Sequence, residues 1–118
     1  MKRFLMLMVV FWMAMGVAVA QDDYYVRKAQ SYQRDAEYYQ KQAESYRREA
    51  AYYLKKAEGY QREVSYYTRK GDVDRVKRYS DYAEDAMDDY ERQLRYAAEA
   101  EDKAATRLRW AAEALEKR

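Results

Sequence analysis

The chain has 118 residues, a formal net charge of +2, and no Cys, His or Pro. This length allows one domain at most. Without Cys there are no disulfides and no thiol nucleophile, and without His the commonest general base and a common zinc ligand are missing. No Gly-rich phosphate-binding loop is present either. We therefore expect a protein that is not an enzyme and that has no catalytic, cofactor-binding or metal site.

Residues 1–20 have the features of a secretory signal peptide. Lys2 and Arg3 precede an apolar run that ends in two small residues, Ala18 and Ala20, and polar residues follow at once. Small residues in this spacing are what signal peptidase requires, so we expect cleavage after Ala20 and export to the bacterial periplasm or the extracellular space. The alternative is an uncleaved membrane anchor, because the apolar run is at the short limit for a membrane span.

The remainder, residues 21–118, has no excess of basic residues. Loss of Lys2 and Arg3 lowers the 23 basic residues to 21, which equals the 21 acidic residues. Nucleic-acid-binding domains usually have a marked basic excess. We therefore expect no nucleic-acid partner.

The first half of this domain is a heptad repeat of tyrosine and alanine residues. The seam tyrosines are Tyr25, Tyr32, Tyr39, Tyr46, Tyr53, Tyr60 and Tyr67, and the seam alanines that follow by four residues are Ala29, Ala36, Ala43, Ala50 and Ala57. Alternating spacings of four and three define the seam of a left-handed coiled coil. The pattern predicts a helix over residues 24–70.

A second period, twice as long as the heptad, is superimposed on the first. Extra tyrosines directly precede every second seam tyrosine, and they are Tyr24, Tyr38, Tyr52 and Tyr66. They widen the apolar face beyond the needs of one partner helix, and a two-helix protein of this size is marginally stable alone. We therefore expect a homo-oligomer, with hairpins associating into a helical bundle.

The seam changes phase near Gly71, which stands where the next seam alanine would fall. Continuing the same register would place a run of charged residues on the seam. A turn at 71–72 avoids this, with Gly71 in the left-handed conformation and Asp72 capping a second helix over 73–116. The first half is richer in bases and the second in acids, which favours an all-α antiparallel two-helix coiled-coil hairpin over residues 21–118. One long helix with a stutter at Gly71, dimerising with another chain, is the alternative.

The second helix has an apolar stripe of its own. Its expected members are Val76, Ala83, Met87, Tyr90, Leu94, Ala97, Ala104, Leu108, Ala111 and Leu115, widened by Tyr79, Ala86, Ala100 and Ala114. Glu101 interrupts it.

Two charged features remain outside the seam. A basic stripe lies opposite it and comprises Arg27, Arg34, Lys41, Arg48, Lys55, Arg62 and Arg69. An acidic cluster comprises Asp81, Glu84, Asp85, Asp88, Asp89 and Glu91. The stripe could follow an anionic envelope polymer, and the cluster could hold a divalent cation. For both we favour a solvated helix face, with the cluster lying beside Lys55, Lys56 and Arg62.

These patterns indicate a structural or scaffolding protein of the cell envelope that works through self-assembly. The alternative is a periplasmic binding module or a chaperone-like holdase. It would use the tyrosine face or the basic stripe on envelope polymers or unfolded clients.

Overall fold

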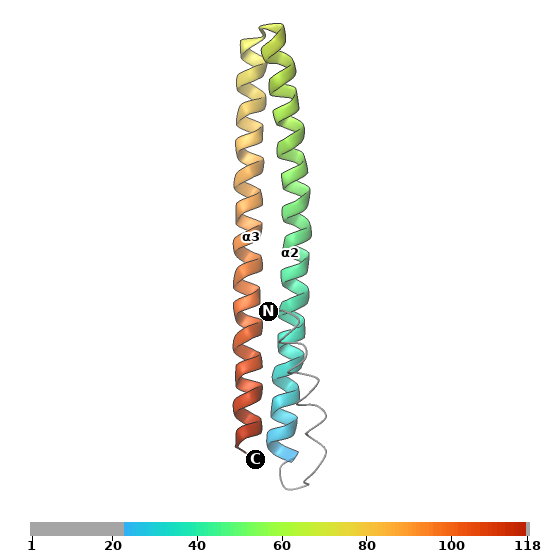
Figure 1. Ribbon diagram of the computed structural model, residues 1–118, viewed down its shortest axis with the longest axis vertical. Coiled ribbons are helices and arrows are strands. Elements are labelled where there is room, and N and C mark those ends of the chain that lie inside the picture. The colour runs from blue at the N-terminus through green and yellow to red at the C-terminus, as the bar shows by residue number, and fades with distance from the viewer. Residues whose placement is uncertain (1–22, 118) are drawn as a thin grey trace. The chain divides into compact units, whose positions relative to one another are not determined.

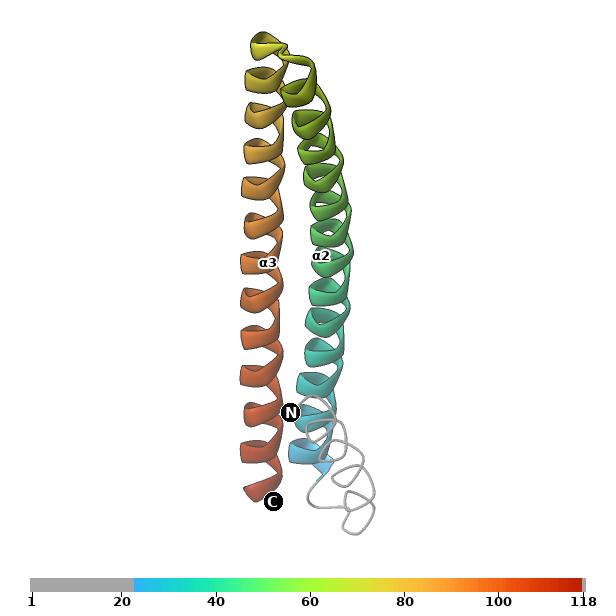
Figure 2. The same cartoon turned by 45° about the horizontal axis from the view of Figure 1, so that its top comes forward.

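The computed structural model of the protein describes residues 23–117. They form two helices, α2 (Asp23–Lys70) and α3 (Val73–Glu116), joined by Gly71 and Asp72. The helices lie side by side and run in opposite directions (Figures 1 and 2). The predicted all-α antiparallel hairpin is confirmed, and the alternative of one continuous helix is wrong. The expected signal peptide, with Ala18 and Ala20, lies outside the described residues.

The described residues divide into two compact units. The terminal unit consists of residues 23–41 and 100–117, and the turn unit consists of residues 42–99. Each unit contains one stretch of α2 and one of α3.

The turn between the helices is a Schellman motif followed directly by a helix cap. Gly71 has a φ of 75°, its N–H donates to the carbonyl of Thr68, and the N–H of Asp72 donates to the carbonyl of Tyr67. These two bonds satisfy carbonyls that the end of α2 would otherwise leave free. The Asp72 carboxylate then accepts a hydrogen bond of 3.1 Å from the N–H of Arg75, which caps the start of α3.

The interior of both units is built almost entirely from alanine. The buried alanines of the turn unit are Ala43, Ala50, Ala57, Ala83, Ala86 and Ala97, and those of the terminal unit are Ala29, Ala36, Ala100, Ala104, Ala111 and Ala114. Leu108 is the only larger hydrophobic side chain that is buried among the described residues. Small side chains allow two helix backbones to approach closely, but they bury little apolar area.

The seam of α3 follows its own strict heptad, which differs in part from the expected stripe. Steps of seven from Val76 and from Tyr79 reach only half-buried or buried residues, including Gln93 and Arg107. Leu94, expected in the stripe, is 39% exposed. The polar seam residues are tolerated because their aliphatic stems can cover the seam while the polar ends reach water.

Neither described helix is long and apolar enough to cross a membrane.

Candidate functional site: an aromatic flank

All seven seam tyrosines are half-buried, and each ring contacts at least one other aromatic ring. Aromatic pairs are favourable at centroid separations of about 4.5–7 Å, especially when one ring's edge meets another's face. The seam therefore provides a row of ring pairs, and the ring partners come alternately from the two helices.

Four seam tyrosines pair with the residue that directly precedes them in α2. The pairs are Tyr24–Tyr25, Tyr38–Tyr39, Tyr52–Tyr53 and Tyr66–Tyr67, with centroid distances of 5.1, 5.4, 5.2 and 5.0 Å. All four pairs are edge-to-face. The double-heptad period seen in the sequence is therefore a period of ring pairs.

The other three seam tyrosines pair across the hairpin with α3. The pairs are Tyr32–Trp110 at 5.6 Å, Tyr46–Tyr96 at 5.4 Å and Tyr60–Tyr82 at 5.4 Å. Each step of two heptads forward along α2 is matched by a step of two heptads backward along α3. Thus α3 supplies a ring wherever α2 has Ser31, Ser45 or Gly59 in place of an extra tyrosine.

We call each seam tyrosine with its outer ring a rung, and the set of outer rings the aromatic flank. The outer rings of the terminal unit are Tyr24, Tyr38 and Trp110, and those of the turn unit are Tyr52, Tyr66, Tyr82 and Tyr96. They are 37–61% exposed. In the terminal unit the outer rings of α2 and α3 share one side, because Lys28 lies over the Tyr24 ring and also lines a hollow with Tyr32 and Trp110.

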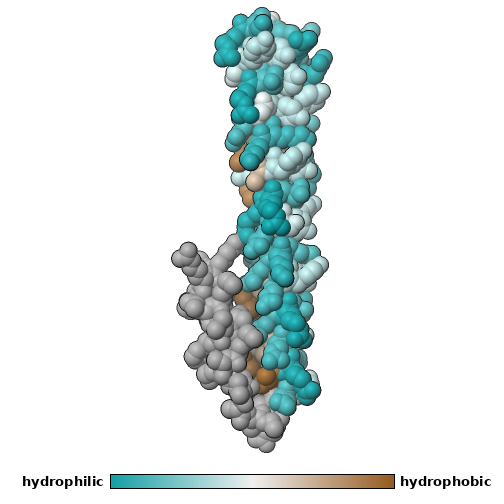
Figure 3. Space-filling model, turned by 90° about the vertical axis from the view of Figure 1, so that its right-hand side faces the viewer, coloured by the Kyte–Doolittle hydropathy of each residue, from teal (hydrophilic) through white to brown (hydrophobic). Residues whose placement is uncertain are grey.

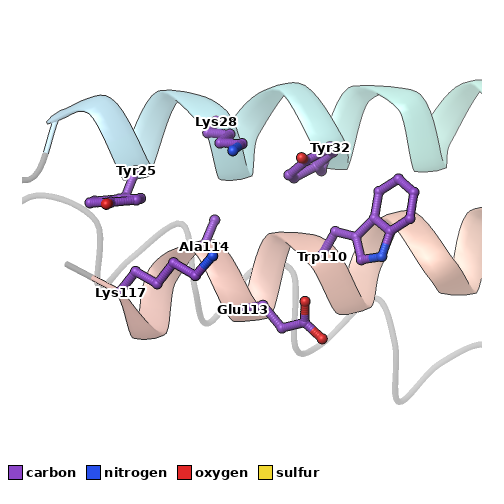
Figure 4. A pocket seen from close by; sticks show the side chains of 7 residues that line it. All are labelled: Tyr25, Lys28, Tyr32, Trp110, Glu113, Ala114 and Lys117. Atoms are coloured by element: carbon purple, nitrogen blue, oxygen red, sulfur yellow. The ribbon is translucent and has the colours of Figure 1, made fainter.

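The hollow in the terminal unit opens between two rungs. It has a volume of about 270 Å³ and is lined by rings of Tyr25, Tyr32 and Trp110. Figure 4 shows Lys28 on the α2 side, with Glu113 and Lys117 on the α3 side. The hollow thus combines aromatic walls with two ammonium groups and one carboxylate.

A second hollow, in the turn unit, has a volume of about 180 Å³. The rings of Tyr60 and Tyr82 line it together with Lys56, Asp85 and Asp89. Lys56 also lies over the Tyr52 ring at 5.7 Å, as Lys28 does over Tyr24. The charge balance is reversed here, because two carboxylates face one ammonium group.

Near the turn the rungs merge into a cluster of five tyrosines, Tyr60, Tyr66, Tyr67, Tyr79 and Tyr82. Tyr67 and Tyr79 are stacked, with centroids 5.5 Å apart and an interplanar angle of 6°. Arg75 lies over the Tyr67 ring at 5.1 Å. Because Tyr66 and Tyr82 are 42% and 43% exposed, the cluster is open to water.

In the terminal unit the Arg107 side chain contacts two aromatic rings and one carboxylate. Its guanidinium carbon lies 4.5 Å from the Trp110 ring centroid and 5.7 Å from that of Tyr39, and its Nε lies 3.8 Å from a carboxylate oxygen of Asp35. A planar guanidinium suits this role, since its faces stack on rings while its charge attracts a nearby carboxylate.

The seven residues of the basic stripe are all exposed, as expected for a helix face directed away from the seam. Of the acidic cluster, Asp85 and Asp89 line the second hollow beside Lys56, and Asp89 accepts a 2.9 Å hydrogen bond from Arg92. Within residues 23–117, no group of three or more acidic residues is arranged to hold a metal ion.

The hydropathy of the residues alone does not reveal the aromatic flank. The described part of the surface in Figure 3 is mostly hydrophilic, with hydrophobic colour limited to small patches. Sequence reasoning also missed the α3 rings, because Tyr82, Tyr96 and Trp110 fall outside its apolar stripe. Their double-heptad spacing, the same as that of the extra tyrosines in α2, is the signal that could have identified them.

Comparisons with protein-family models, with curated proteins and with solved structures find no match to this chain.

Proposed function

We propose that this protein is an exported, non-enzymatic coiled-coil protein of the cell envelope, with a structural role performed through self-assembly. One observation supports this above others. The hairpin encloses almost only alanine, while seven aromatic rings in repeating rungs remain 37–61% exposed.

Such a distribution is unfavourable for an isolated hairpin. Apolar burial contributes about 25 cal/mol per Å² removed from water, and alanines offer little area. The rings offer far more, but water still reaches them. A second copy that covered the aromatic flank would add this missing burial, and small helical scaffolds often gain stability by oligomerising.

The test is the molar mass of the protein after export. The full chain is expressed with its own N-terminus, the exported fraction is purified, and mass spectrometry determines where the chain begins. Light scattering on a sizing column then gives the molar mass at tens of micromolar protein. We expect a chain beginning at Gln21 and a dimer or larger assembly. A folded monomer at these concentrations rejects self-assembly, and a chain that retains residues 1–20 rejects cleavage.

A second candidate function is that of a binding module for an anionic envelope polymer, or a holdase for unfolded clients. The hollow of the terminal unit favours it, because Lys28 and Lys117 stand beside three aromatic rings. Binding to lipopolysaccharide or to an acidic polysaccharide should then weaken as salt is raised, since exposed charges are screened. The absence of binding at low salt, together with no effect on client aggregation, excludes this function.

A further inference from the structure

We infer that Tyr67 and Tyr79, in the cluster near the turn, form a site of covalent modification, at which a haem peroxidase acting with hydrogen peroxide joins the two rings by a carbon–carbon bond. The bond would tie α2 to α3. The chain has no Cys, so it cannot close this turn with a disulfide. Coupled phenols offer a covalent link that does not need one. The inference goes beyond self-assembly and does not depend on it, because both rings belong to one chain and to the turn unit.

The arrangement of these two rings suits radical coupling. Their centroids are 5.5 Å apart and their planes are nearly parallel, with an angle of 6° between them. The unpaired electron of a phenoxyl radical occupies orbitals that point out of the ring plane, so two such rings join most readily when they lie face to face. The other ring pairs of the cluster are tilted or edge-to-face, and they are Tyr60–Tyr79, Tyr60–Tyr82, Tyr66–Tyr67 and Tyr79–Tyr82. The stacked pair is therefore the one that we expect to couple.

The turn itself positions the stacked pair. The carbonyl of Tyr67 accepts the hydrogen bond from the Asp72 N–H, so Tyr67 is part of the Schellman motif. Arg75 lies over the Tyr67 ring at 5.1 Å, and its Nε lies 3.5 Å from the Asp72 carboxylate. Tyr79 lies within the first two turns of α3. Groups that a short loop holds together react in an intramolecular step, which is far faster than an encounter between separate chains.

The coupling balances with hydrogen peroxide as the oxidant. Each phenol loses one electron and its hydroxyl proton, and these two electrons and two protons convert one molecule of peroxide into two of water. The two phenoxyl radicals then form a bond between the ring carbons that neighbour their oxygens. The hydrogens on those carbons leave as protons, and protons return to the oxygens, which restores both phenols.

Exposed rings lead from water to the stacked pair. Tyr67 and Tyr79 are half-buried, whereas Tyr66 and Tyr82 are 42% and 43% exposed. The Tyr66 ring lies 5.0 Å from that of Tyr67, and the Tyr82 ring lies 5.8 Å from that of Tyr79. Oxidation of an outer ring at the surface therefore reaches the pair by electron transfer between rings in contact. Residues 42–99 contain no Trp or Cys that would compete for the radical.

A bond between these rings would stabilise a unit in which every buried hydrophobic side chain is an alanine. A cross-link removes conformations from the unfolded chain, as a disulfide does. We therefore expect the urea midpoint of the linked protein to lie above that of the untreated protein.

The test treats the purified exported protein with a haem peroxidase and hydrogen peroxide. After trypsin digestion, mass spectrometry should find peptide 63–69 joined to peptide 79–92, with the mass of two hydrogen atoms missing. Fragment ions should place the bond on Tyr67 and Tyr79. On a denaturing gel the linked protein should migrate as a monomer.

Variants that keep a ring but lack its hydroxyl identify the residues that react. Tyr67→Phe and Tyr79→Phe retain the stacked rings and should each reduce the yield of the joined peptides by at least about tenfold. Tyr52→Phe is the matched control, because this ring belongs to the same unit but pairs edge-to-face with Tyr53. It should leave the yield unchanged. Far-UV circular dichroism verifies that every variant remains helical.

The outcomes separate this inference from the proposed self-assembly. Absence of the joined peptides overturns the inference, and so does a link that persists in Tyr67→Phe or Tyr79→Phe. Cross-linked dimers as the main product also overturn it, because they place the reactive pair between chains. An unchanged urea midpoint of the linked protein overturns the stabilising role of the bond. None of these results bears on self-assembly, which the molar mass of the untreated protein tests separately.

Discussion

The terminal and turn units share the same seam of alanines and the same ladder of ring pairs, but they complete their interiors differently. In the terminal unit Leu108 packs between the helices with Ala36 and Ala104, and Tyr39 lies against this group. In the turn unit every buried hydrophobic side chain is an alanine, and five tyrosines gather near the turn. The comparison suggests that aliphatic burial stabilises one unit and ring stacking the other.

The largest expected effect tests this difference with two leucines of α3 that are two heptads apart. Leu108 is 4% exposed and Leu94 is 39% exposed. Leu108→Ala removes the largest side chain that is buried among the described residues and should lower the free energy of unfolding by about 2–4 kcal/mol. Leu94→Ala, the matched control in the turn unit, should lower it by less than about 1 kcal/mol. Urea unfolding followed by circular dichroism at one fixed protein concentration measures both, and equal losses would remove the distinction between the units.

A smaller effect concerns the two glycines of the turn unit. Gly71 has a φ of 75°, so Gly71→Ala should destabilise the hairpin by about 1–2 kcal/mol even though nothing lies within 4 Å of the added Cβ. At Gly59, inside α2, an added Cβ meets only the Arg62 guanidinium at 3.8 Å. Gly59→Ala should therefore stabilise the protein by about 0.5–1 kcal/mol, because alanine favours a helix more than glycine does. Thermal unfolding should show melting temperatures moving in opposite directions, and a loss at both positions would contradict this account.

The smallest effect compares one arginine from each unit. Arg107 contacts two rings and Asp35, and its side chain is 26% exposed. Arg92 pairs with Asp89, at side-chain exposures of 48% and 36%. Arg107→Ala should cost about 1 kcal/mol through lost packing and cation–π contact, whereas Arg92→Ala should change stability by less than about 0.5 kcal/mol. Urea unfolding measures the loss of stability in both arginine variants. A larger loss for Arg92→Ala than for Arg107→Ala would contradict this prediction.

Much of the fold could be predicted because its main signal is local. The tyrosines and alanines of α2 repeat strictly, so the helix and its seam follow from counting residues. Gly71 interrupts that count, and charged residues on the continued seam exclude one uninterrupted register. The turn then depends on two neighbouring residues, a glycine at positive φ and a capping aspartate, whose preferences are intrinsic to the residue types.

The pairing of rings could not be predicted from α2 alone. Tyr82, Tyr96 and Trp110 each directly precede a buried alanine of α3, one position outside the expected apolar stripe, so the stripe does not include them. They become ring partners only because the turn sets which residue of α3 lies opposite each seam tyrosine. The contacts of Arg107 with Tyr39, Trp110 and Asp35 could not be predicted either, because they depend on the same alignment of α2 and α3.

The sequence by itself determined that this protein forms two helices in an antiparallel hairpin, because heptad periodicity and turn chemistry act between residues near one another in the chain. Only the tertiary structure decided that the double-heptad period of α2 is completed by rings from α3, and that the outer rings of both units remain exposed. The physical reason is register. Side-chain contacts between two helices depend on their mutual alignment to within a few ångströms, and that alignment is fixed by the geometry of the turn together with the packing of the whole seam.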